Sequence, residues 1–461
     1  MKRALILGLL LAGCAPDVRP SLTPKPATDL GLTGPAIAPV DAEWWRAFGD
    51  PQLDRLVADA LAGSPTLEAA TARVRQAEAV VEQRGAEDGP NVTFDADSQV
   101  ARLSGRYTIP PPYAGTVRTI GTAAVNLNWN LDLFGRQKAA IEGARASAAA
   151  ARLDVEAARL MLAGAVVQAY LDLARAERQA QVARSSITTR EGSLKLVQVR
   201  IRNQLASKLD ATAAETLLAQ ARQAAEQATG ARALAANALA ALAGRGPDYA
   251  AQVRSAALKL DALQLPQVLP ADLLARRADV AAAQARIAAA AAGRQVARRA
   301  FYPNINLLAN VGLQAIGIGN FFNIDAGTAG AGGAVHLPIF DHGRLRADLG
   351  AAVAAEDAAI ADYDRIVVTA AREGADAVAS VRTLDAQATR ASQVVQGFAE
   401  ANRLNGIRLR SGLESRLALV DTDIRLLDAQ LILANLQVDA ALARVQLALA
   451  LGGGFSSQDI P

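Results

Sequence analysis

The chain has very little of the chemistry on which enzymes and disulfide-stabilised proteins depend. It has one cysteine, Cys14, and two histidines, His336 and His342, among 461 residues. A lone cysteine cannot form an intramolecular disulfide, and these histidines, with only Asp341 nearby, lack the spacing of metal ligands. No glycine-rich loop follows a strand and opens a helix in the way that a nucleotide site requires. We therefore expect no catalytic residues, no cofactor and no metal site.

The charge balance and the hydropathy pattern exclude two further classes of protein. The 48 basic and 45 acidic residues are interspersed and leave a formal charge of only +3. No basic stripe is present to favour a nucleic-acid partner. After the N-terminal residues, no stretch is apolar enough to predict a membrane helix. If the mature chain crosses a membrane, we expect it to do so with strands.

Proline is absent from residues 113–246 and from residues 339–460. Nothing therefore obliges a helix to break in either stretch. The segment from Gln137 to Asn203 has 67 positions, and as one helix it would reach ~100 Å at 1.5 Å per residue. Helices of this length are typical of coiled coils and helical repeats rather than of globular enzymes.

The predicted helix at residues 417–451 has two neighbouring apolar seams. The first consists of Ile424, Leu427, Leu431, Ala434, Val438, Ala441, Val445 and Ala448, and the second of Ala429, Leu433, Leu436, Ala440, Ala443, Leu447 and Ala450. A coiled-coil dimer needs only one seam, so this helix is expected to pack on neighbours at both sides, as a stave of a closed cylinder. The residues expected to face solvent are Asp428, Gln430, Asn435, Gln437 and Asp439.

The chain contains the same unit twice. Residues 135–244 align with residues 343–452 without a gap (343 − 135 = 208), so that Arg136 matches Arg344. An earlier block repeats at a slightly different offset (277 − 64 = 213). A duplicated unit that packs against copies of itself indicates a quasi-symmetric ring or array.

Each repeat has two runs in which polar and apolar residues alternate, the pattern of a strand with one apolar face. The four runs lie near residues 91–100, 119–133, 304–314 and 333–340, and the glycines at 317–319 and 330–333 are expected to lie in loops. Each run is near the ~9 to 11 residues that a tilted membrane strand needs, although a soluble sheet with one wet face alternates in the same way. Because the smallest membrane barrels have about eight strands, one chain cannot close a barrel alone.

The N-terminus has the features of a secretion signal. A short basic region, Met1–Arg3, precedes an apolar run, Ala4–Leu11, which is too short for the ~20 residues of a membrane helix. The following Leu-Ala-Gly-Cys string resembles a bacterial lipobox, which implies cleavage before Cys14 and lipid, such as palmitate, on the new N-terminus. A chance thiol is the alternative. We expect a signal peptide at 1–13 and a proline-rich, lipidated tether at 14–40, and Ala15 favours the outer membrane.

Three longer motifs carry a family resemblance, namely Trp44–Leu53, Leu269–Val280 and Ala300–Ile305. Together with the repeat, they resemble the lipoprotein branch of the TolC-type outer-membrane efflux channels, the OprM- and NodT-like group. The resemblance covers essentially the whole mature chain. Two positions depart from it: Ala278 stands where the family commonly has proline, and Gln204 replaces a glycine that Gly412 keeps in the second repeat.

This resemblance implies an α+β membrane protein that forms a homotrimer. Its 3 × 4 = 12 strands would form one outer-membrane β-barrel, continued into a long periplasmic α-helical barrel. Repeat 1 (41–260) would supply strands at about 90–133 and a helical hairpin at 137–243, and repeat 2 (261–461) strands at about 303–340, a hairpin at 344–451 and a short tail.

The function that the resemblance implies is a passive outer-membrane channel in a tripartite efflux system, exporting drugs and toxic compounds from the periplasm. The implied partners are a periplasmic adaptor (membrane fusion protein), an inner-membrane resistance-nodulation-division pump and outer-membrane lipid, without nucleic acid. A structural coiled-coil envelope lipoprotein or adhesin with no open pore is the alternative.

The resemblance also assigns functional residues to two equivalent hairpin tips. Adaptor docking is implied for Arg202, Leu205, Ser207, Gly412, Leu413 and Ser415, and a periplasmic gate for Asp421, Asp423, Asp210 and Arg410. Three copies of Asp421 around an axis would bring like charges together and favour opening or cation binding, while Arg410 would hold the closed packing. The alternative is that Asp421, Asp423 and Arg425 form a solvated face with ordinary intrahelical pairs.

We predict that Cys14 is the mature N-terminus and carries lipid, because the apolar segment that ends there has no other evident use for its sulfur. One acyl chain anchors a protein only marginally, so several chains and the barrel would act together. Mass spectrometry of the N-terminal peptide from membrane-purified protein would show acylated Cys14. An unmodified Cys14 in that material would contradict this prediction.

Overall fold

The structure is a computed structural model that describes residues 16–26, 29, 32, 35, 40–265 and 272–455. Cys14 and the predicted signal peptide lie outside these residues. The chain folds into two compact units. The strand unit consists of the described residues within Met1–Pro24, Arg73–Ala151 and Ala282–Tyr363, and the hairpin unit of those within Lys25–Ala72, Arg152–Ala281 and Asp364–Pro461.

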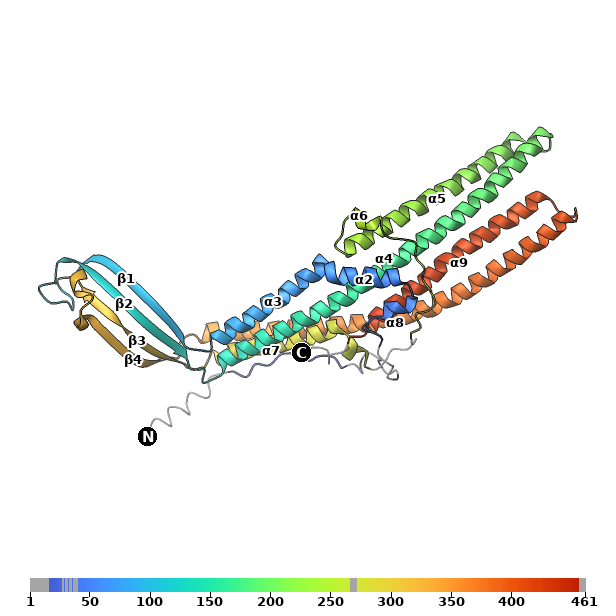
Figure 1. Ribbon diagram of the computed structural model, residues 1–461. Helices are drawn as coiled ribbons and strands as arrows, with labels where there is room; N and C mark the ends of the chain where they lie inside the picture. Colours follow the sequence, from blue (N-terminus) through green and yellow to red (C-terminus); the bar gives the residue numbers. More distant parts are fainter. Residues whose placement is uncertain are drawn as a thin grey trace. The chain divides into compact units, whose positions relative to one another are not determined.

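The element order repeats itself along the chain (Figure 1). In the first half it is η2 (Trp44–Phe48), α2 (Pro51–Gly63), α3 (Pro65–Ala86), β1 (Asn91–Arg102), β2 (Val117–Asn130), α4 (Arg136–Arg202), α5 (Lys208–Leu242) and α6 (Pro247–Ala250). In the second half it is η3 (Leu273–Arg276), α7 (Ala278–Arg299), β3 (Asn304–Ile316), η4 (Ile318–Asn320), η5 (Ile324–Ala326), β4 (Gly327–His336), α8 (His342–Arg410) and α9 (Arg416–Ala450). The uninterrupted helices predicted from the absence of proline are confirmed, with 67 residues in α4 and 69 in α8.

The strand unit contains an antiparallel sheet in the chain order β1-β2-β3-β4. Its register places Val92 opposite Leu127 and Leu127 opposite Ala309, so that apolar residues share one face. Thr93, Asn126 and Asn310 follow one another across the other face. The alternation predicted from the sequence therefore describes β1, β2 and β3 correctly.

The fourth strand differs from its prediction. It begins at Gly327 and ends at His336, whereas the alternation predicted residues 333–340. The glycines at 330–333, expected in a loop, instead pair with β3, as Gly330 does with Asn310. Glycine has no side chain to show an alternation and is depleted in strands, so the sequence pattern could not reveal this segment.

The described part of the tether lies against α8 in the strand unit. The Ser21 hydroxyl and the Leu22 amide both donate to the Asp357 carboxylate, at 2.8 and 2.9 Å. The Leu22 amide is the main reason why the pKa of Asp357 lies below its usual range. The described residues of the tether are therefore bound to α8 in the structure.

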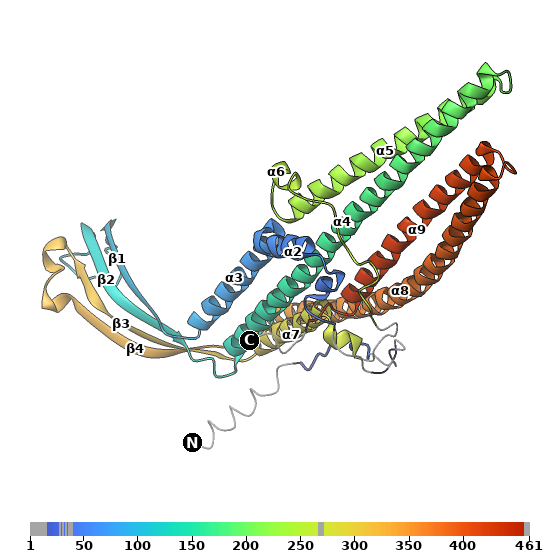
Figure 2. The same cartoon turned by 45° about the vertical axis from the view of Figure 1, so that its right-hand side comes forward.

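In the hairpin unit, α4 pairs with α5, α8 pairs with α9, and α4 also lies beside α9 (Figures 1 and 2). Polar side chains join these last two helices, with Arg175 to Asp439 at 2.7 Å, Arg178 to Gln437 at 3.2 Å and Gln179 to Asn435 at 2.9 Å. Gln437 is exposed as expected, but Asn435 and Asp439 are only partly exposed, and all three side chains contact α4. They form a polar row between neighbouring helices, because α9 has a partner on this side as well.

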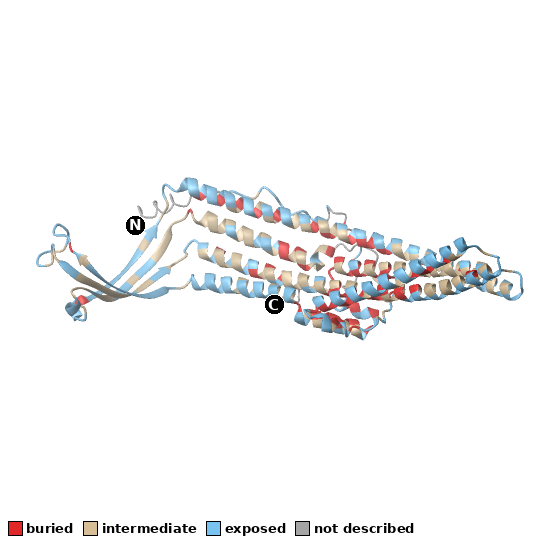
Figure 3. Ribbon diagram, turned by 90° about the horizontal axis from the view of Figure 1, so that it is seen from above, coloured by how far each residue is buried: buried red, intermediate tan, exposed pale blue. Residues whose placement is uncertain are grey.

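The two apolar seams of α9 contact different neighbours. Val438 and Val445 are fully buried in a cluster with Trp44, Tyr170 and other residues of η2, α2, α4 and α5. Leu447 lies in a second cluster with residues of η3 and α8. Figure 3 shows this concentration of buried residues in the hairpin unit. The prediction that α9 packs on both sides is confirmed.

Two helices are more apolar than the sequence analysis expected. Both α4 and α9 contain 18-residue windows with mean hydropathy 1.3, long and apolar enough to cross a membrane by that measure alone. The expectation that no such stretch follows the signal was wrong. Alanine supplies much of this hydropathy, and residues in both windows are buried against other parts of the protein, 44% in α4 and 28% in α9.

A buried polar network fastens the segments that cover α4. Asp50 is 5% exposed and begins α2 by accepting a hydrogen bond from the Gln52 amide at 2.9 Å. The same carboxylate accepts from the Tyr170 hydroxyl at 2.7 Å and from the Ala257 amide at 2.8 Å. Burial and the neighbouring Asp50 carboxylate raise the pKa of Tyr170. One acidic side chain thus joins α2, α4 and the segment after α6.

We predict that Tyr170→Phe destabilises the protein by about 1 to 3 kcal/mol, because a buried carboxylate loses one of its donors. Tyr249→Phe is the matched control, since Tyr249 donates to Asp59, which is only partly buried. Thermal unfolding followed by circular dichroism should show a larger decrease in Tm for Tyr170→Phe. Equal decreases in the two variants would contradict the role given to Asp50.

Candidate functional site

The sheet exposes its apolar face. Phe94, Val311 and Val335 belong to different strands and are 69%, 59% and 69% exposed. Soluble monomers rarely expose contiguous apolar patches beyond a few hundred square ångströms. The opposite face carries asparagine, threonine and aspartate, so this sheet is suited to separate an apolar medium from a polar one.

The two edges of the sheet, like its apolar face, indicate that the sheet needs partners outside the chain. Within the described residues, β1 pairs only with β2, and β4 pairs only with β3. Each edge therefore presents a row of backbone groups without partners among the residues that the structure describes. In lipid, every unpaired amide costs several kcal/mol, so such edges must be paired by other chains.

The hairpin tips of the two repeats have the same backbone geometry. Gln204 and Gly412 occupy equivalent positions (204 + 208 = 412) and both have positive φ, 60° and 72°. The next amide bonds back into the preceding helix in each tip, Leu205 to Arg200 at 2.8 Å and Leu413 to Arg408 at 2.9 Å. Gln204 thus adopts the conformation for which the family resemblance expects glycine, at a cost of roughly 1 to 2 kcal/mol for a residue with a Cβ.

Each tip presents one exposed leucine. Leu205 and Leu413 follow the left-handed residue and are 68% and 71% exposed. A residue at this position commonly packs back on its own helix end, and these two do not. The tips therefore offer an apolar side chain at equivalent places, next to the exposed Arg202 and Arg410.

The serines of the tips begin the returning helices. The Ser207 and Ser415 hydroxyls accept hydrogen bonds from the Asp210 and Ala418 amides at 3.4 and 3.2 Å. Asp210 completes a capping box by accepting from the Ser207 amide at 2.7 Å, and this bond is the main cause of its lowered pKa. The structure thus gives Asp210 and both serines a local role in helix initiation.

The proposed gate residues have different surroundings in the single chain. Asp421 pairs with Arg425 at 2.9 Å one turn along α9, and both are exposed. Asp423 instead accepts a hydrogen bond from Asn402 of α8, inside the hairpin. Arg410 has no ion pair with a described residue. Asp421 and Arg410 are therefore the two gate candidates that remain available to another chain.

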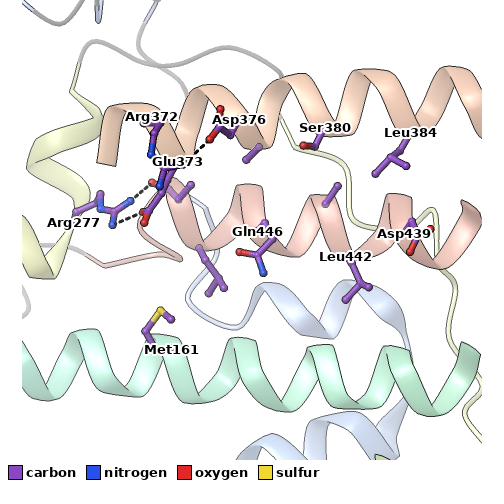
Figure 4. Close-up of a pocket in the computed structure, with 14 residues that line it drawn as sticks. Met161, Arg277, Arg372, Glu373, Asp376, Ser380, Leu384, Asp439, Leu442 and Gln446 are labelled. Atoms are coloured by element: carbon purple, nitrogen blue, oxygen red, sulfur yellow. Dashed lines mark hydrogen bonds and ion pairs between the residues drawn. The ribbon is translucent and has the colours of Figure 1, made fainter. Parts of the chain in front are cut away.

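A cavity of about 560 Å³ lies between α4, α8 and α9 (Figure 4). Met161 of α4 lines it, together with Leu442 and Gln446, which lie on the face of α9 between its two buried seams. Arg277 closes one end and pairs with Asp279 at 2.8 Å and Glu373 at 3.0 Å.

Arg277 is a structural residue that the sequence analysis did not identify. Burial opposes its charge, but hydrogen bonds and the charges of its two carboxylate partners raise the pKa of this guanidinium above its ordinary value. Its side chain also donates to the Ala450 carbonyl at 3.4 Å. The available signal was its place in the motif Leu269–Val280, whose second arginine ties the start of α7 to α8 and α9.

Comparison with known proteins decides what this arrangement is for. The profile of the family described as "Outer membrane efflux protein" matches residues 56–245 and 269–453, which together include both repeats. The chain belongs to this family. Its sheet is therefore a β-barrel segment of an outer-membrane channel, its long helices belong to the α-helical barrel that extends into the periplasm, and it is not an enzyme.

The relatives agree in function. The chain is 33% identical to the pyoverdine export outer membrane protein OpmQ of Pseudomonas aeruginosa, over 97% of this chain and 96% of that protein. It is 30% identical to the multidrug resistance outer membrane protein MdtQ of Escherichia coli, over the same shares. This chain is accordingly the outer-membrane channel of an efflux system, which sets aside the alternative of a spacer or adhesin without a pore.

The solved structures give the same fold. The outer membrane protein VceC of Vibrio cholerae has a TM-score of 0.83 at 32% identity, over 90% of this chain and all of that one. The outer-membrane channel OprN has a TM-score of 0.82 at 26% identity, over 95% and 99%. The predicted fold class is thus confirmed.

We predict that arginine is poorly tolerated on the apolar face of the sheet and tolerated on the polar face. Leu127→Arg or Leu307→Arg should cost roughly 2 to 4 kcal/mol per copy, because the charge would enter lipid near midspan. Asn128→Arg is the matched control on β2. Assembly of each variant can be followed by the heat-resistant oligomer on semi-native gels, and equal assembly of all three would contradict the assigned faces.

Proposed function

We propose that three copies of this chain form one passive conduit from the periplasm to the exterior, with energy supplied by partner proteins. The single observation that carries the proposal is the four-stranded sheet with an exposed apolar face and two unpaired edges. Three such sheets supply twelve strands, which is within the size range of closed outer-membrane barrels. Channels of this family work as trimers with an adaptor and an inner-membrane pump.

The specific partners proposed are a periplasmic adaptor of the membrane fusion class and a resistance-nodulation-division pump. The hairpin tips are the proposed docking sites. Their exposed leucines, Leu205 and Leu413, stand beside Arg202 and Gly412 in loops of matching geometry. Two equivalent tips per chain would give a trimer six quasi-equivalent contacts, which suits a ring of adaptor hairpins.

The cargo proposed is small organic molecules. The relatives support this class by their names, which include fusaric acid resistance for FusA of Burkholderia cepacia, 36% identical over 76% of this chain and 68% of that protein. The residues that the structure describes contain no group of histidine, cysteine, aspartate or glutamate side chains that could hold a metal ion. Because the proposed conduit is passive, selection of the cargo would fall to the pump.

The proposed gate lies at the second hairpin. Asp421 from each copy would face the axis of the trimer, where like charges repel and favour opening. Arg425 on the same face would offset part of this repulsion, since it already pairs with Asp421 in the single chain. Arg410, without an ion pair among the described residues, would bind a neighbouring chain and hold the closed state. Asp423 and Asp210 would support the constriction through the hairpin bond and the capping box.

We predict that Arg410→Ala makes the channel leak in planar bilayers. If the lost pair is worth about 1 kcal/mol per copy, the ratio of open to closed channels should rise about fivefold per copy. Arg202→Ala is the matched control, because Arg202 is the equivalent residue of the first repeat (410 − 208 = 202). A channel with Arg410→Ala that stays as closed as the control would contradict the role of Arg410.

The second gate experiment measures block by a trivalent cation. Hexamminecobalt should block the parent channel, and Asp421→Ala should weaken this block because the ring of carboxylates is lost. Asp428→Ala, an exposed acid on the same helix, is the control. An Asp421→Ala channel that is blocked as strongly as the parent would return Asp421 and Arg425 to an ordinary solvated pair.

A further inference from the structure

The loop between β3 and β4 exposes large apolar side chains that the channel function does not use. This outer loop, residues 317–326, carries Ile318, Phe322 and Ile324, which are 72%, 86% and 91% exposed. Its only charged residue is Asp325. Exposed apolar side chains in such density are typical of an interaction surface rather than of a loop in water.

Phe321 fixes the side of the sheet on which the outer loop lies. A Cβ placed on Gly121 would come within 3.0 Å of its ring, so the ring covers the side-chain face of that glycine. Gly121 alternates along β2 with Ala123 and Val125 and pairs with Ala315 of β3, on the apolar face. The outer loop therefore folds over the face of the sheet that the barrel turns toward lipid, and not over the polar face.

The outer loop is held in this position by its own hydrogen bonds. The Gly317 amide donates to the Thr119 carbonyl at 2.7 Å, and Gly317 turns the chain with φ 91°. The Asn320 side chain donates to the Ile316 carbonyl at 3.3 Å. The Phe321 and Phe322 rings meet edge to face, 5.2 Å apart. Phe321 is thus the fixed ring on the sheet, and Phe322 is the ring that it holds outward.

We propose that the outer loop is a lipid-contacting segment, in which Ile318, Phe322 and Ile324 enter the acyl chains beside the barrel wall. The occupant follows from continuity, because Phe321 extends the apolar face of the sheet directly into the outer loop. This inference rests on the insertion of the sheet into the outer membrane. Aromatic rings suit the boundary between acyl chains and water, where other interfacial anchors lie.

Spin labels test the proposal in the full-length channel reconstituted in lipid bilayers. A nitroxide on Phe322→Cys reports collisions with oxygen, which partitions into lipid, and with a water-soluble nickel chelate. Val125→Cys on the apolar face is the lipid reference, and Asn128→Cys on the polar face is the water reference. The chain without an added cysteine, labelled in parallel, corrects for any reaction at Cys14.

The proposal expects a ratio of oxygen to nickel collisions at Phe322 nearer to that of Val125 than to that of Asn128. Adding Phe321→Ala should lower this ratio, because the outer loop then loses its support on Gly121. A ratio like that of Asn128 would overturn the proposal in favour of a loop in water. Shielding from both reagents would overturn it in favour of contact with a second copy.

The reference positions separate this test from the proposed function. If Val125 itself failed to show preferential collision with oxygen, the sheet would not be inserted as described, and the channel assignment would fail with it. If Val125 behaved as lipid-facing and Phe322 did not, only the outer-loop proposal would fall.

Discussion

The structure depends on the requirement that every backbone amide in a bilayer has a hydrogen-bond partner. The sheet satisfies this requirement internally for β2 and β3, while the outer edges of β1 and β4 lack partners within the described chain. An isolated copy could not remain in lipid in this form. The barrel is therefore a property of the assembly, and each chain is one of its segments.

The helices outside the bilayer also need neighbouring chain segments, in their case to bury apolar side chains. A helix with two apolar seams, as α9 has, must have neighbours on both sides before its surface is buried. Alanine allows these neighbours to approach closely, and Gly164 of α4 lies directly against Leu449 of α9. The duplicated hairpin supplies two similar staves per chain, so that a ring of similar contacts can be built from one repeated unit. Matching backbone geometry at Gln204 and Gly412 shows how far the two copies retain their correspondence.

Much of this architecture could be predicted from the sequence, because it depends on patterns local to each segment. The absence of proline predicted the continuous α4 and α8, and the two seams predicted the double packing of α9. The position of β4 could not be predicted, since Gly330–Gly333 pair through the backbone alone and leave no side-chain alternation. The row formed by Asn435, Gln437 and Asp439 was missed because its partners lie on α4, more than 250 residues away along the chain.

Less of the candidate site than of the fold could be predicted from the residues themselves. The tips and gate could be named only through a family resemblance, because no chemical motif marks a passive conduit. The structure adds which gate candidates are already engaged: Asp423 by Asn402, and Asp210 by the Ser207 cap. The bond between Asn402 and Asp423 joins two helices, and the Ser207 cap depends on the turn at the hairpin tip. Sequence spacing alone does not determine such contacts.

In the proposed barrel, β1 of one copy pairs with β4 of the next, and closure of the barrel depends on this pairing. Disulfide cross-linking across this junction tests it most directly, with Val92→Cys on β1 combined in turn with Ala329→Cys, Ala331→Cys and Val335→Cys on β4. Mild oxidation of the assembled channel in membranes should yield covalent dimers and trimers for the double variant whose two cysteines lie in register. It should yield none for a chain that carries only one of the added cysteines. If every double-cysteine chain remained monomeric after oxidation, although the chains were fully assembled and the thiols were reactive, the proposed shared barrel would be contradicted.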